Sequence, residues 1–258
     1  MQLLHRIAAA LLGLAILPAS IAGVEKVSSS TRPGLFFAWL SPDTGSVLAY
    51  SGTHADLQAL ARHCNSGRDV FSLQGGTKYK CKFEVFKLPS GVENWDGAYA
   101  TVQGLSPKPG AEQFGLFSTF PPRTTKWTVR KVTPQELGAI NSLVRSDARL
   151  SGPIRRQLKL SSASVVGRSG GSSFTVVVPG AVVRNEEAYY YAQRHHIFLQ
   201  RDGMYSYLGE VPGKPFIYVD IDRNDLPGLV VYEDCDGLCI SLWGLTNGLQ
   251  EIGTFGGH

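Results

Sequence analysis

FIYVDIDRNDLPGLVVYE, residues 216–233, places two apolar runs on either side of a polar loop. The runs 216–219 and 229–232 consist largely of β-branched and aromatic residues, which favour strands. The loop carries Asp220, Asp222 and Asn224 at every second position. The segment therefore predicts two strands joined by a polar loop, and because no helices flank the loop, an EF-hand is excluded.

Oxygen ligands that converge from a tight loop are the preferred environment of a hard cation such as calcium. Residues 216–245 resemble one repeat of the FG-GAP or VCBS type, which decorates the β-propellers of secreted proteins with calcium. On that resemblance, Asp220, Asp222 and Asn224 take the positions of the first three side-chain ligands. The resemblance thus implies a calcium ion bound at this loop, and the alternative is an Asp-rich turn with a structural role alone.

The loop departs from the family pattern at two positions. Asp225 stands where the family has a glycine that permits the sharp turn, and Gly228 stands where the family has its last carboxylate. Losing the closing ligand weakens calcium affinity, and Asp225 is the residue that could replace it. The chain holds no second copy of the repeat, whereas a propeller needs at least four blades, so a whole propeller is not implied.

The first 22 residues read as an export signal. A short segment with one firm positive charge, Arg6, precedes the unbroken apolar run 7–17, which is too short to span a bilayer. Pro18 follows, and the small residues Ser20 and Ala22 have the spacing that a signal peptidase requires, which predicts cleavage after Ala22. We therefore expect a periplasmic or secreted protein, the alternative being a retained membrane anchor.

Composition narrows the classes of protein that remain. Apolar residues make up 43% of the chain, enough for a substantial core. Removing residues 1–22, which contain one Arg and no acidic residue, lowers the formal net charge from +4 to +3. That charge does not indicate a nucleic-acid partner, and export argues against one. No segment after the signal is long and apolar enough to cross a membrane.

Four cysteines fall into two pairs that are each close in sequence: Cys64 with Cys81, and Cys235 with Cys239. An even number in an oxidising compartment predicts two disulfides, and of the three possible connectivities sequence proximity favours 64–81 with 235–239. Cys64 lies on the apolar stripe of a helix predicted from residue 53. Cys81 lies on the apolar face of a strand predicted over 78–86, so the first bridge would tie helix to sheet.

The remaining patterns indicate an α+β, β-rich fold of antiparallel sheets with two or three short helices. Thr133-Pro134-Gln135-Glu136 is a strong helix start, with a cap, a proline at the first position and a glutamate at the third. Beyond residue 171, turn signals every ten to twelve residues predict a C-terminal β-meander. We expect a signal peptide (1–22), an N-terminal α+β region (23–122), and a helical segment followed by the meander (123–258). The alternative is that the last two regions form one domain.

One further pattern concerns binding partners. The region from Arg123 to Lys159 carries nine Lys or Arg and two acidic residues, so it could bind an anionic envelope polymer or a protein; the alternative is a solvated helical surface. His195 and His196 are adjacent on a predicted strand and must point to opposite faces, so they cannot jointly bind one metal.

Residues 167–171, Gly-Arg-Ser-Gly-Gly, fit the G-x-S-x-G pattern of serine hydrolases, with Ser169 as the nucleophile and His63 as the base. The pattern lacks a strand-to-helix passage around the serine, and no acidic residue stands out as the third member of a triad. We therefore assign no catalytic residue. The sequence favours an exported, non-catalytic binding or structural protein of the cell envelope, with calcium as the one candidate cofactor; a secreted hydrolase using Ser169 is the alternative.

Overall fold

The computed structural model describes residues 34–40, 47–50, 54–86, 99–103, 113–123, 125–185, 190–222, 224–233 and 239–255. These residues form three antiparallel sheets with a few short helices, which confirms the α+β, β-rich class predicted from the sequence. The predicted signal peptide, residues 1–22, lies outside the described residues.

Sheet A contains seven strands in the order β4-β3-β7-β1-β2-β6-β5. The strands are β1 (Leu35–Leu40), β2 (Val47–Tyr50), β3 (Asp69–Ser72), β4 (Lys78–Lys80), β5 (Lys82–Phe86), β6 (Tyr99–Gln103) and β7 (Gln113–Ser118). The sequence predicted one strand over 78–86, but the chain leaves the ladder at Cys81, and the two halves pair with different neighbours. Strands β4 and β5 are the two edge strands of this sheet, yet they follow each other directly in the chain. The two edges must therefore lie close together, so the sheet is strongly curved.

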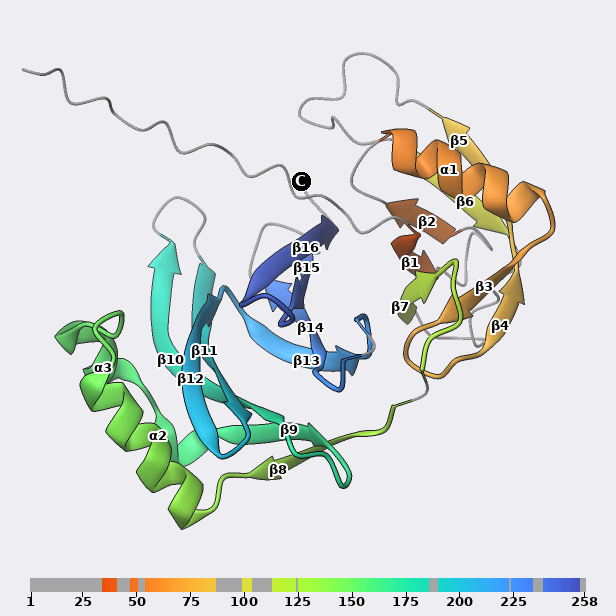
Figure 1. Cartoon of the computed structure of the whole chain (residues 1–258). Helices are drawn as coiled ribbons and strands as arrows, with labels where there is room; N and C mark the ends of the chain where they lie inside the picture. Colours follow the sequence, from red (N-terminus) through yellow and green to blue (C-terminus); the bar gives the residue numbers. More distant parts are fainter. Residues whose placement is uncertain are drawn as a thin grey trace, which may run out of the picture.

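Helix α1 (His54–Asn65) packs against β5 on the outside of sheet A (Figure 1). Its buried stripe contains Leu60, Ala61 and Cys64, as the sequence predicted. The sulfurs of Cys64 and Cys81 are 2.01 Å apart, so the predicted bridge between helix and sheet is present.

Removing this bridge is expected to lower the free energy of unfolding by about 2–3 kcal/mol, because the disulfide closes a loop with a sequence separation of 17. The variant is Cys64→Ala with Cys81→Ala, since two alanines leave no unpaired thiol and bury no new polar group. Urea denaturation of the variant beside the wild type measures the change. An unchanged midpoint and slope would show that the packing of α1 alone holds it on the sheet.

Sheet B contains five strands in the order β12-β11-β10-β9-β8 and is covered on one face by helices. The strands are β8 (Trp127–Lys131), β9 (Ser164–Arg168), β10 (Phe174–Asn185), β11 (Tyr190–Arg201) and β12 (Met204–Val211). The helices are α2 (Pro134–Ser146), α3 (Gly152–Gln157) and the 3-10 turn η1 (Leu160–Ser162). Ile140 and Val144 of α2 are buried in one cluster with Val176, Phe198 and Tyr207 of the sheet.

The start of α2 has the capping box that the sequence predicted. The hydroxyl of Thr133 accepts from the backbone N–H of Glu136, and the Glu136 carboxylate accepts from the backbone N–H of Thr133. The same carboxylate pairs with the Arg130 guanidinium through two contacts of 2.8 and 2.6 Å. These hydrogen bonds from Arg130 are the main reason that the pKa of the Glu136 carboxyl falls from its ordinary 4.5 to about 2.

Glu136 should therefore stabilise the fold in a pH-dependent way. A carboxyl whose folded pKa is lowered adds stability that is fully present above the unfolded pKa of about 4.5 and is lost as the pH falls towards 2. Because Arg130 is half exposed, we expect about 1–2 kcal/mol. Glu136→Gln should be less stable than wild type by this amount at pH 7, and the difference should shrink by pH 3. A difference that is constant from pH 7 to pH 3 in denaturant titrations would contradict this assignment.

Sheet C is a four-stranded antiparallel meander in the order β13-β14-β15-β16. Its strands are β13 (Lys214–Val219), β14 (Gly228–Glu233), β15 (Cys239–Gly244) and β16 (Gln250–Phe255), so the predicted C-terminal meander is confirmed. Strands β13 and β14 are the two strands predicted within residues 216–233.

Sheet C lies between the other two sheets, as Figure 1 shows. On one side, Val230 and Leu242 share a buried cluster with Leu35 and Leu116 of sheet A. On the other side, Leu229 and Val231 share a second cluster with residues of sheet B, namely Val166, Val177, Ile197, Leu199 and Val211. Strand β14 is therefore buried on both faces, which explains the continuous apolar run Leu229-Val230-Val231.

Candidate functional site

The Asp-rich loop between β13 and β14 is held by hydrogen bonds to neighbouring segments. Asp220, only 3% exposed, accepts from the Thr125 hydroxyl at 3.0 Å. Asp222 accepts from the Thr246 hydroxyl. The Asn224 side chain donates to the Thr246 oxygen at 2.7 Å and accepts from the backbone N–H of Leu226 at 3.0 Å. The loop is thereby tied to the segment before β8 and to the connection between β15 and β16 in sheet C.

The two positions that depart from the calcium-repeat pattern have clear structural roles. Asp225 adopts a left-handed conformation, with φ of 62°, at the position where the family has glycine. Its carboxylate lies 2.7 Å from Arg168 of β9 and 3.9 Å from Arg123. Gly228 has no room for a side chain, because a Cβ atom there would lie 2.0 Å from Cδ1 of the buried Ile221.

In this arrangement the four predicted calcium ligands make hydrogen bonds or ion pairs with other protein groups. Within the part of the chain described above, no three His, Cys, Asp or Glu side chains gather closely enough to hold a metal ion. Asp225 pairs with two arginines, and Gly228 lies against the buried Ile221. Calcium binding by Asp220, Asp222, Asn224 and Asp225 stays a prediction.

Ser169 lies in the exposed turn between β9 and β10, so the Gly-Arg-Ser-Gly-Gly motif joins two strands of one hairpin. His63 lies near the end of α1, where its Nε2 is 2.8 Å from the backbone oxygen of Asp69. Figure 1 shows α1 and the β9–β10 turn in widely separated parts of the molecule. The structure does not bring these two residues together.

The second cysteine pair is described in part. Cys239 opens β15 and its sulfur is disulfide-bonded. Cys235 lies outside the described residues, so the pairing of 235 with 239 stays a prediction.

The basic region from Arg123 to Lys159 is partly neutralised within the protein. Arg130 pairs with Glu136, Arg149 pairs with Asp147, and Arg155 donates to backbone oxygens. Five further basic residues are exposed and make no ion pair with a described carboxylate: Lys126, Lys131, Arg145, Arg156 and Lys159. Binding of an anionic polymer or protein by this surface stays a prediction.

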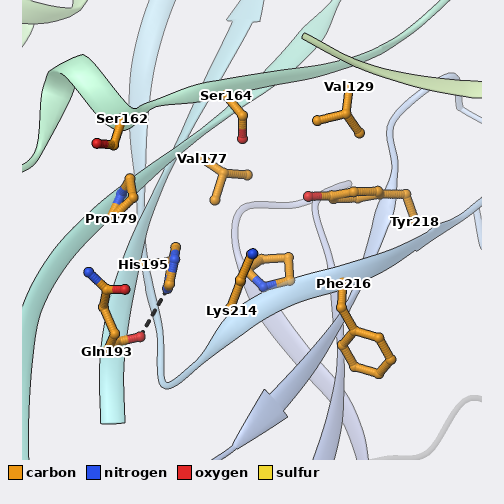
Figure 2. A pocket seen from close by; sticks show the side chains of 11 residues that line it. Val129, Ser162, Ser164, Val177, Pro179, Gln193, His195, Lys214, Phe216 and Tyr218 are labelled. Atoms are coloured by element: carbon orange, nitrogen blue, oxygen red, sulfur yellow. Dashed lines mark hydrogen bonds between the residues drawn. The ribbon is translucent and has the colours of Figure 1, made fainter. Parts of the chain in front are cut away.

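A cavity of about 530 Å³ opens between sheets B and C, and the sequence alone did not reveal it. Sheet B contributes residues from β8 to β11, and β13 of sheet C forms the opposite wall (Figure 2). The eleven lining residues are Val129, Ser162, Ser164, Val177, Pro179, Gln193, His195, Lys214, Pro215, Phe216 and Tyr218. A volume of this size falls within the range of small-molecule sites, roughly 300–1,000 Å³.

Polar groups of different character project from the two walls. The His195 side chain is buried, with its Nδ1 2.9 Å from the backbone oxygen of Gln193, and burial lowers the pKa of the imidazole, which is therefore neutral at pH 7. Burial raises the pKa of Tyr218 to about 12, so its hydroxyl keeps its proton at pH 7. Figure 2 shows this hydroxyl directed into the cavity, and Lys214 of the same strand also lines it.

His196 points away from the cavity, as the strand alternation predicted. Its Nδ1 lies 3.0 Å from the Tyr207 hydroxyl, within the layer between sheet B and its helices. Gly180 makes room for the ring, since a Cβ atom there would lie 2.7 Å from Nε2 of His196. The two histidines therefore belong to different layers of the fold.

No family model matches the chain, and no curated protein or solved structure shows significant similarity to it. None of the helices among the described residues is long and apolar enough to cross a membrane.

Proposed function

We propose that the protein is an exported, non-catalytic binding protein of the cell envelope, and that the cavity between sheets B and C is its ligand site. The observation that carries this proposal is the cavity itself, whose wall is largely apolar with a few polar groups, as in small-molecule sites. The apparent signal peptide supports export, and the Cys64–Cys81 bridge is of the kind that persists in oxidising compartments.

Filling the cavity tests the proposal. Ser164 lies on the cavity wall in β9, so Ser164→Trp would occupy the space with an indole ring. A thermal-shift screen of small apolar and amphipathic compounds should find ligands that stabilise the wild type and do not stabilise Ser164→Trp. Ser161→Trp, at an exposed position that does not line the cavity, is the matched control and should respond to ligand like the wild type. Equal stabilisation of all three proteins would place binding elsewhere.

Three further measurements address the other proposals. A broad screen of fluorogenic esters, peptides and glycosides should show no turnover, whereas turnover that Ser169→Ala abolishes would establish the hydrolase instead. A thermal melt with and without EDTA decides whether calcium stabilises the loop at Asp220.

N-terminal sequencing tests export. The mature protein should begin at Gly23, which follows the predicted cleavage point.

A further inference from the structure

Two polar side chains that line the cavity, Lys214 and Tyr218, have no acceptor among the residues that the structure describes. Among the described residues, the Tyr218 hydroxyl makes no hydrogen bond, and the Lys214 amine makes no hydrogen bond or ion pair. Lys214 lies close enough to His195 for its positive charge to help lower the pKa of that imidazole, although burial is the main cause. This electrostatic interaction with His195 is a second indication, beside the list of lining residues, that the Lys214 charge lies close to the cavity.

Among the described residues that line the cavity, none is Asp or Glu. The neutral imidazole of His195 adds no negative charge, and the Gln193 backbone oxygen already faces its Nδ1. Lys214 is exposed and Tyr218 is half-buried, and both line the cavity. One anionic group can accept from an ammonium and a phenol hydroxyl, and hydrogen bonds to a charged group are the stronger kind.

The rest of the wall suits an apolar body. Val129 and Phe216 line the cavity and are 56% and 44% exposed, while the lining residue Val177 is buried and Pro179 follows it in β10. Exposed apolar side chains that line a cavity indicate a surface that is covered when the site is filled.

We propose that the ligand is a small anionic amphiphile, whose negative head group binds the Lys214 ammonium and the Tyr218 hydroxyl and whose apolar body packs against Val129, Val177, Pro179 and Phe216. This inference rests on the proposed function and adds the chemical class of the ligand. It requires no covalent step and no cofactor.

A matched pair of fluorescent probes tests it. 1-Anilinonaphthalene-8-sulfonate and N-phenyl-1-naphthylamine share one aromatic body, and only the first carries a negative head group. The wild type should bind the sulfonate about tenfold or more tightly than the neutral probe, because the head group gains charge-assisted hydrogen bonds. Lys214→Met and Tyr218→Phe should each weaken binding of the sulfonate several-fold and leave binding of the neutral probe unchanged. Decanoate should displace the sulfonate, and decanol should not.

The controls are Lys82→Met and Tyr79→Phe in sheet A, which remove the same groups far from the cavity and should bind both probes like the wild type. Cooperative unfolding of every variant establishes that it is folded. Equal binding of both probes, with no effect of Lys214→Met, would overturn the proposal that the ligand is anionic. The proposal that the cavity is the binding site would still stand. Binding of neither probe to the folded wild type would overturn both proposals.

Discussion

Replacing Leu229 by alanine is expected to lower the free energy of unfolding by about 3–5 kcal/mol, among the largest effects of any single truncation in this chain. Leu229 is fully buried on the face of β14 that packs on sheet B. The cavity left behind cannot collapse easily, because β14 is held on its other face by Val230 against sheet A. The neighbours of Leu229 are thus fixed from two directions.

Tyr232→Ala on the same strand is the matched control, since Tyr232 is 46% exposed and its loss should cost less than about 1 kcal/mol. Equilibrium denaturation in urea, with the slope as well as the midpoint, measures both variants. Equal and small losses from the two substitutions would show that sheet C does not form the common core of the molecule.

The second large effect is expected at Gly213, in the turn that leads into β13. A Cβ atom there would lie 1.7 Å from the backbone oxygen of Tyr232, closer than any non-bonded contact allows. Since the obstacle is backbone, relief requires that β13 move away from β14, and Gly213→Ala should cost about 3 kcal/mol or more. The same displacement would carry Lys214 with it and should weaken ligand binding at the cavity.

Gly138→Ala provides the contrast. Gly138 lies on the exposed face of α2 with nothing within 4 Å of its ideal Cβ position, so alanine there should stabilise the protein by about 0.5–1 kcal/mol. Thermal melts of the two variants should therefore move in opposite directions. A Gly213→Ala protein as stable as wild type would mean that the turn can be rebuilt without loss of the β13–β14 pairing.

Much of the local structure could be predicted from the sequence because local rules decide it. The start of α2 follows from Thr133 and Glu136, whose side chains and backbone groups satisfy each other within one turn of chain. The strands around the Asp-rich loop follow from their apolar runs. The opposite orientation of His195 and His196 follows from strand geometry alone.

What escaped prediction depends on contacts between distant segments. The periodicity over 78–86 is that of one strand, but nothing in it reveals that Cys81 separates two pairings at opposite ends of sheet A. The cavity unites residues as far apart as Val129, Ser164, His195 and Tyr218, each unremarkable in its own strand. Phe216 is a large apolar residue that remains 44% exposed, but this exposure is visible only in the structure.

The position of sheet C has a consequence for the order in which the protein can mature. Sheets A and B come first in the chain, and the apolar surfaces that they turn towards sheet C stay uncovered until residues 214–255 have been synthesised. Both sheets therefore complete their native packing only after this C-terminal segment is present.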